Sequence, residues 1–128
     1  MKDLFMALAG HLRASQLYYH YMHHTASGAC FAADHKMFKS FYQQAEDAYD
    51  RVIEYALGHA TPIADPLQQM ETIHAVLEVG DAVEMEKQLQ SICDMFDEKE
   101  ISIALETLVG DIAQEGSVRL YKLQQRAK

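Results

Sequence analysis

Apolar side chains recur every three or four residues along most of this chain, a spacing that places them on one side of an α-helix. The pattern is clearest in two long segments, 3–25 and 32–58. Their apolar positions are Leu4, Met6, Leu8, Leu12, Leu17 and Tyr21, followed by Phe38, Phe41, Ala45, Tyr49, Val52, Ile53 and Leu57. Only six glycines and two prolines interrupt the 128 residues, which favours helix over sheet. We therefore predict two long amphipathic helices, separated by a turn in the segment TASGAC.

Helix-start signals divide the rest of the chain into three further helices. Three acidic residues have the spacing of capping boxes: Asp65 with Gln68, Asp81 with Glu84, and Asp97 with Glu100. The first box, with Pro66 in the first turn, predicts a short helix to about residue 79. The second predicts a helix to about residue 96, and the third a long helix to about residue 125. Within that last helix, Gly110 and Gly116 either weaken it by about 1 kcal/mol each or mark close backbone packing.

No strand is left over, so the sequence predicts an all-α fold in a single domain, residues 1–128. Four main helices, with a short one in the crossover between the second and third, indicate a four-helix bundle. One long crossover is typical of the ferritin-like arrangement.

The acidic balance of the chain argues against nucleic-acid binding. The formal net charge is −8, and a negative surface repels a phosphate backbone. The one basic segment is the end of the chain, which carries Arg119, Lys122, Arg126 and Lys128. Cations that stabilise a helix C-terminus explain this segment better than a DNA-binding tail does.

Cysteine usage and hydropathy favour a cytoplasmic protein. Cys30 and Cys93 are far apart and have neither metal nor redox spacing, so two reduced thiols are favoured over a single disulfide. The first fifteen residues fit an amphipathic helix better than a signal peptide. No run approaches the roughly 20 apolar residues of a membrane span.

Histidines and carboxylates gather in the first two predicted helices. Four of the seven histidines are His20, His23, His24 and His35, and Asp50 and Glu54 follow one helical turn apart. Mixed imidazole and carboxylate ligands suit iron, zinc or manganese. His35 and Asp50 would be about 22 Å apart on one helix. One ion could therefore use both only if a second, antiparallel subunit supplied half of the site.

Other interpretations of these residues stay open at this point. Acidic residues at four-residue spacing are more often a solvated helix face, and His20 and His24 are more often exposed polar residues than ligands. The segment Glu71 to His74 copies the Glu-x-x-His motif of di-iron bundles, but it occurs only once.

The residues from 20 to 58 resemble a known family in both identity and spacing. The matching positions are His23, Gly28, Phe31, His35, Phe38, Tyr42, Asp50 and Glu54. This pattern is similar to the signature of the Dps family, the DNA-binding proteins from starved cells, which are small dodecameric members of the ferritin-like fold. Elsewhere the resemblance rests on helix order and length.

The resemblance implies a ferroxidase centre shared by two subunits of a homododecamer. His23 and His35 would come from one chain, and Asp50 and Glu54 from its two-fold partner. Such a protein binds Fe(II), oxidises it with hydrogen peroxide or dioxygen, and stores the product, which prevents hydroxyl-radical damage. Zinc is a possible substitute metal. Acidic residues that would guide iron to pores or cavity are Asp94, Asp97, Glu98, Glu106 and Asp111, each of which is individually better explained as an exposed charge.

The chain departs from the family pattern at two positions. Lys39 stands where the family has a carboxylate, four residues after the second histidine. Its ammonium either occupies the position of a second cation, leaving a one-metal centre, or pairs with Glu46 or Asp50, leaving no working centre. His24 stands where tryptophan is common. The chain also begins without a lysine-rich arm, so direct DNA binding is doubtful. The alternative function is a ferritin-like shell or structural protein without iron oxidation, binding zinc or a single metal.

Overall fold

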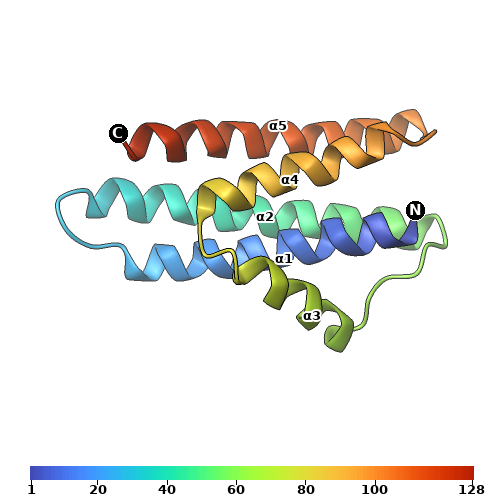
Figure 1. Ribbon diagram of the computed structural model, residues 1–128, viewed down its shortest axis with the longest axis horizontal. Coiled ribbons are helices and arrows are strands. Elements are labelled where there is room, and N and C mark those ends of the chain that lie inside the picture. Colours follow the sequence, from blue (N-terminus) through green and yellow to red (C-terminus); the bar gives the residue numbers. More distant parts are fainter.

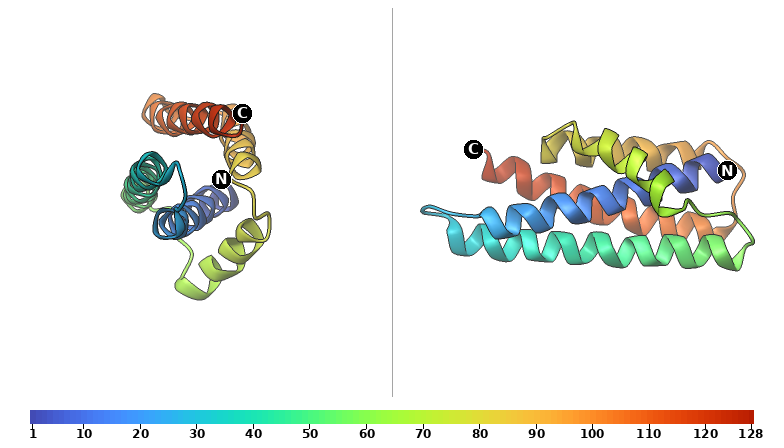
Figure 2. Two further views of the ribbon diagram at one scale, coloured as in Figure 1. Left: turned by 90° about the vertical axis from the view of Figure 1, so that its left-hand side faces the viewer. Right: turned by 90° about the horizontal axis from the view of Figure 1, so that it is seen from below.

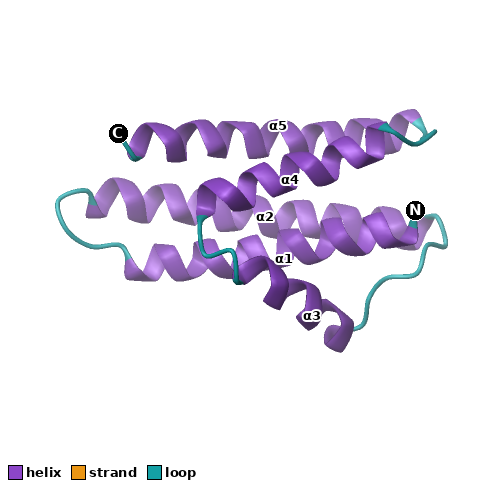
Figure 3. Cartoon of the chain, in the orientation of Figure 1, coloured by secondary structure: helices purple, strands orange, loops and turns teal.

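The chain folds into five α-helices and no strand. A computed structural model describes all 128 residues. The helices are α1 (Lys2–Thr25), α2 (Phe31–Gly58), α3 (Pro66–Leu77), α4 (Ala82–Asp97) and α5 (Ile103–Arg126) (Figure 3). The prediction of an all-α protein is confirmed. No helix is both long enough and apolar enough to cross a membrane.

The four longer helices lie side by side as a helical bundle (Figure 1). α1 pairs mainly with α2, and α4 with α5, each pair being antiparallel. α2 and α4 run in the same direction, because the connection through α3 returns part of the way along the bundle before α4 begins. Figure 2 shows α3 outside the other four helices, where it packs against α1.

A glycine allows α3 to approach α1 closely. A Cβ atom added to Gly10 would lie 2.8 Å from Cβ of Thr72 in α3, which is closer than real side chains come. The middle of α1 therefore needs a residue without a side chain at this crossing.

Two of the three predicted helix starts are confirmed. Asp65 and Gln68 form a reciprocal capping box: the Gln68 N–H donates to Asp65 Oδ1 at 2.9 Å, and the Asp65 N–H donates to Gln68 Oε1 at 2.9 Å. Asp81 caps α4 by accepting the Val83 N–H at 3.2 Å. Glu84 does not complete a box there, and pairs instead with Lys87 at 3.4 Å.

The third predicted start, at Asp97, is wrong. Asp97 belongs to α4, and α5 begins after Ser102, whose Oγ accepts the Leu105 N–H at 3.1 Å. Phe96 is fully buried, so packing keeps α4 helical up to this point and moves the break to residues 98–102. A local capping signal was outweighed by tertiary burial.

The core consists of two apolar clusters along the bundle. The larger includes Phe5, Leu8, Leu12, Val52, Leu89, Phe96, Val109 and Ile112. The smaller consists of Tyr19, Phe38, Phe41 and Leu123. Most of the predicted apolar stripe is buried, but Leu17, Tyr21 and Leu57 are about half exposed or more, at 48%, 63% and 58%.

Candidate metal centre

The loop between α1 and α2 brings His23 and His35 together. His23 lies in the last turn of α1 and His35 near the start of α2, and their ring centroids are 3.7 Å apart in a stacked arrangement. Gly28 takes a positive φ of 82° in this loop, a conformation that other residues rarely adopt. The sequence-based pairing of these two histidines is therefore present within one chain.

Reciprocal hydrogen bonds determine which nitrogen of each ring carries a hydrogen. Nδ1 of His23 lies 2.7 Å from the carbonyl oxygen of His35, and Nδ1 of His35 lies 2.9 Å from the carbonyl oxygen of His23. A carbonyl oxygen only accepts, so each Nδ1 carries the hydrogen and donates it. In the neutral rings the lone pairs are then on the two Nε2 atoms, and neither has a hydrogen-bond partner in the chain. Metal-binding histidines commonly donate the hydrogen of their other ring nitrogen to a carbonyl or carboxylate oxygen in this way.

Aromatic rings and an ion pair hold the histidine pair in place. The Phe31 ring lies 5.1 Å from the His35 ring, and the Tyr42 ring 5.5 Å from that of His23. Asp34, beside His35 in the chain, accepts two hydrogen bonds of 2.8 Å from the Arg126 guanidinium. These bonds lower the pKa of the Asp34 carboxyl below its ordinary value, and they tie the start of α2 to the end of α5.

Asp50 and Glu54 are exposed on α2, one turn apart, on the side opposite its buried stripe. Neither forms an ion pair within the chain. No group of three or more His, Cys, Asp or Glu residues of one chain is arranged to hold a metal ion. The structure therefore brings the two histidines together but leaves the two carboxylates away from them. This agrees with the separation of His35 from Asp50 along α2 that the sequence predicts.

Lys39 is exposed on α2 and makes no ion pair with Glu46, Asp50 or any other residue of its own chain. The alternative in which Lys39 neutralises these carboxylates is thus absent from the single subunit. The five acidic pore candidates are all exposed.

Two other histidine motifs differ in outcome. His74 pairs with Glu78, 2.8 Å away, rather than taking part in a site with Glu71. His20 and His24 lie on an exposed face of α1, with their Nε2 atoms 3.0 Å apart. The first arrangement is an ordinary surface pair, whereas the second brings two potential ligand atoms together.

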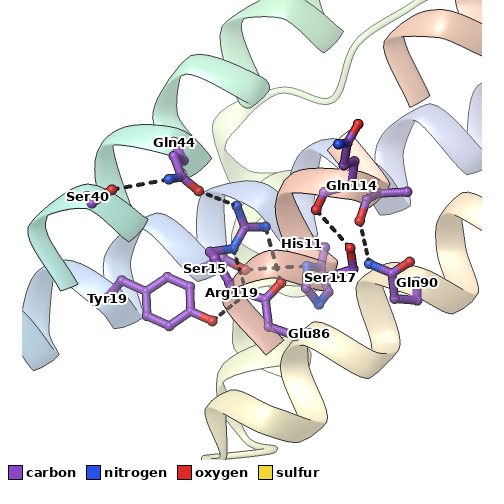
Figure 4. A network of polar contacts seen from close by, with 11 residues as sticks. His11, Ser15, Tyr19, Ser40, Gln44, Glu86, Gln90, Gln114, Ser117 and Arg119 are labelled. Carbon is purple, nitrogen blue, oxygen red and sulfur yellow. Dashed lines mark hydrogen bonds and ion pairs between the residues drawn. The ribbon is translucent and has the colours of Figure 1, made fainter. Parts of the chain in front are cut away.

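A buried polar network, which the sequence analysis missed, crosses the bundle near its centre (Figure 4). Arg119 donates to both Glu86 oxygens at 2.9 and 3.1 Å and to Gln44 Oε1 at 3.0 Å. The Tyr19 hydroxyl also donates to Glu86, and burial together with the neighbouring carboxylate raises the pKa of Tyr19 well above its ordinary value.

The spacing of apolar residues along α5 could have indicated that Arg119 is buried. The buried positions of α5 are Leu105, Val109, Ile112, Gly116, Arg119 and Leu123, so Arg119 falls on the core side by helical spacing. Arg119 and Arg126 are therefore not free cations of a basic tail, because both are engaged by carboxylates of other helices.

No protein-family model, curated protein or solved structure matches this chain.

Proposed function

We propose that the chain is the subunit of a Dps-like miniferritin, in which Fe(II) is the substrate of a site shared between two subunits. His23 and His35 would bind from one chain, and Asp50 and Glu54 from the partner. The fold is proposed to be ferritin-like, since a long crossover between parallel second and third main helices is the arrangement of that class.

The observation that carries the proposal is the reciprocal bonding of His23 and His35. The bond from His35 also satisfies a carbonyl in the last turn of α1, where carbonyls lack an intrahelical partner. A metal site gains further from both bonds, because they hold the two rings still and leave their Nε2 lone pairs free. The donor set of two imidazoles and two carboxylates also suits Fe(II) or Zn(II).

A partner subunit related by a two-fold axis would supply the carboxylates that one chain cannot bring to its histidines. An axis crossing α2 near Gln43, about midway between His35 and the turn that carries Asp50 and Glu54, would pair two antiparallel copies of α2. The carboxylates of each copy would then lie beside the histidines of the other. Gln43 is exposed, as a residue at such a crossing must be before assembly.

Exposed apolar side chains near α1 and α2 support an interface there. Leu17 and Tyr21 are exposed one turn apart on α1, and Leu57 is exposed on the Asp50 face of α2. Beside Leu17, α3 contributes Met70, Ile73 and Leu77 to a shallow apolar groove of about 500 Å³. A second copy that covers any of these side chains would bury apolar area that is otherwise in water.

In this site the protein's own groups bind and position the substrate. The imidazoles and carboxylates would hold Fe(II), and reduction of one hydrogen peroxide to two waters would take two protons and two electrons, one electron from each of two Fe(II) ions that occupy the site in succession. The partner's carboxylates balance the positive charge of the bound ions. Lys39, which carries a positive charge close to His35 in the chain, favours a single metal position per site.

The lysine at position 39, where the resembling family has a carboxylate, is the basis of the second candidate, a shell that binds zinc or one metal ion and has little or no oxidase activity. Anaerobic titration of Fe(II) into metal-free protein, followed by addition of peroxide, separates the two candidates. Saturation near one Fe(II) per site and rapid oxidation support the ferroxidase. Binding without oxidation, or zinc binding alone, supports the shell.

Replacing the carboxylates tests the site assignment directly. We expect Asp50→Ala/Glu54→Ala to abolish fast Fe(II) oxidation, followed by the absorbance of the ferric product. Glu71→Ala/Glu84→Ala is the control, since it removes two exposed acidic residues, one from α3 and one from α4, that belong neither to the site nor to the acidic pore candidates. Unchanged initial rates in the Asp50/Glu54 variant would refute the assignment.

The predicted interface has a test that does not depend on metal. A cysteine near a two-fold axis faces its own copy, so Gln43→Cys in a Cys30→Ser background should form a disulfide-linked dimer under mild oxidation. Lys87→Cys, on the exposed face of α4, serves as the control and should stay uncrosslinked. A monomeric mass in solution, or equal crosslinking of both variants, would contradict the shared site.

A further inference from the structure

His20 and His24 form a second concentration of ligand atoms beside the proposed centre. They are one turn apart on α1, and their Nε2 atoms are separated by 3.0 Å. Their rings lie next to that of His23, with centroid distances of 6.4 Å from His20 and 5.2 Å from His24. Together with His35, four imidazoles therefore gather at this end of α1 and α2.

The separation of the two Nε2 atoms is the one that a shared metal ion requires. Two nitrogens bound at about 2.0–2.1 Å in right-angled or tetrahedral geometry lie about 2.9–3.4 Å apart. Without a cation between them, two lone pairs at 3.0 Å repel, unless one nitrogen carries a hydrogen and donates it to the other. The contact is thus either a hydrogen bond between imidazoles or a chelating pair.

The residues around His20 and His24 favour a chelating pair, because they restrict the positions of the rings before a metal binds. The Tyr42 ring of α2 packs against the His20 ring at 4.4 Å between centroids, which restricts its rotation. The rings of His20 and His24 are 4.6 Å apart. Both histidines are exposed in the single chain, so an ion can reach them from solvent before assembly and keep water on its remaining positions.

We infer that His20 and His24 chelate one divalent transition-metal ion of the kind that imidazole prefers, such as Zn(II), at a site distinct from the His23–His35 pair. Both ligands come from one chain, so this site does not depend on the proposed function or on assembly. Ligation would also link two successive turns near the end of α1, where helices otherwise fray.

Zinc titration of the full-length, metal-free chain tests the inference by calorimetry. We expect His20→Gln/His24→Gln to lose one Zn(II) per chain, or to bind it at least about tenfold more weakly. Loss of a group that only hydrogen-bonds to a metal ligand already weakens metal binding by about tenfold or more. The matched control is His59→Gln/His74→Gln, which removes two exposed histidines that do not form a pair. The control should bind Zn(II) at His20 and His24 as the unaltered chain does.

A third variant separates this site from the proposed iron centre. His23→Gln/His35→Gln should keep the Zn(II) bound by His20 and His24, whatever happens to Fe(II) oxidation. If zinc binding is lost in this variant but retained in His20→Gln/His24→Gln, the inference is wrong, because the zinc is then held by the other pair. Equal binding by all three variants would also overturn it, leaving only a hydrogen bond between the two imidazoles.

Two readouts locate the ion independently of affinity. In crystals soaked with Zn(II), the anomalous peak at the zinc edge should lie about 2.0–2.1 Å from both Nε2 atoms. A ligand that binds only the folded state stabilises it. Zn(II) should therefore raise the thermal unfolding midpoint of the unaltered chain and of His59→Gln/His74→Gln. The increase should be smaller for His20→Gln/His24→Gln. A peak elsewhere, or equal stabilisation of the three proteins, would contradict the assignment.

Discussion

Arg119 of α5 holds both carboxylate oxygens of Glu86 of α4, and the two side chains are only 2% and 1% exposed. Tyr19 and Gln44 complete the contacts from α1 and α2, so all four helices of the bundle meet at this pair (Figure 4). The charges are compensated and nearly all their hydrogen-bonding positions are used, which is the condition under which a buried ion pair is tolerated.

Removing one member of this pair should be severely destabilising. We expect Arg119→Met to lower the free energy of unfolding by about 3–5 kcal/mol, because the Glu86 carboxylate stays buried without a cation. Glu86→Gln/Arg119→Met should lose less than the sum of the single changes. Denaturant unfolding at fixed protein concentration measures both, and additive losses would show that the pair is not coupled.

Two glycines of α5 should respond oppositely to alanine. A Cβ on Gly110 meets nothing within 4 Å, so Gly110→Ala should stabilise the helix by about 1 kcal/mol. A Cβ on Gly116 would lie 3.0 Å from Leu89 Cδ2 and 3.2 Å from Glu86 Oε1. We expect Gly116→Ala to be net destabilising by about 1 kcal/mol, because overpacking costs more than the helix gains. Thermal unfolding of the two variants checks this, and stabilisation by both would refute the close packing.

Burial of His11 should make the protein less stable in mild acid. Desolvation lowers the pKa of His11 from 6.5, against the opposing effect of Glu86, and Arg119 lowers it further. As pH falls below 6.5 the unfolded chain therefore binds a proton at this position before the folded chain does, and the free energy of unfolding decreases. The decrease approaches about 1.4 kcal/mol for each pH unit until the folded pKa is reached.

His11→Leu isolates this effect, since it also removes the Nε2 atom that is buried without a hydrogen-bond partner. The stability of His11→Leu relative to the unaltered chain should rise as pH drops from about 7.5 to about 5.5, while all other histidines are common to both proteins. A difference that does not change with pH would mean that His11 is protonated equally in both states.

The two cysteines should differ widely in reactivity. Cys30 is exposed, whereas Cys93 is buried and burial raises its pKa to about 12. The thiolate is the reacting form, so a thiol reagent at about pH 8 should label Cys30 rapidly and Cys93 only when the protein opens. Cys30→Ser and Cys93→Ser assign the two phases. Equal rates in the folded protein would contradict the burial of Cys93.

Helix positions were predictable because their determinants are local. Apolar spacing identified α1 and α2 to within a residue at each end, and the Asp65–Gln68 box marked the start of α3. The start of α5 was not predictable in this way. Asp97 has the spacing of a cap, but it is the last residue of α4, whose final turn includes the buried Phe96, and Ser102 takes the capping role for α5.

The candidate site was predictable in part for the same reason. His23 and His35 flank a short loop, so their meeting follows from helix length and turn position, and the structure shows them stacked. Their reciprocal bonds to backbone carbonyls were not predictable, since these depend on the angle at which α1 enters and α2 leaves the loop.

The helical character of the chain, the positions of most helices and the meeting of His23 with His35 could be predicted from the residues alone. Helix formation and short-loop closure depend on residues close together in the chain. Which charged residues are buried depends instead on how the helices pack. Glu86 and Arg119 are 33 residues apart, and each resembles an ordinary helix charge until α4 and α5 pack together. Helix packing also leaves Leu17, Tyr21 and Leu57 facing solvent, since a periodic stripe can be wider than the face that neighbouring helices cover.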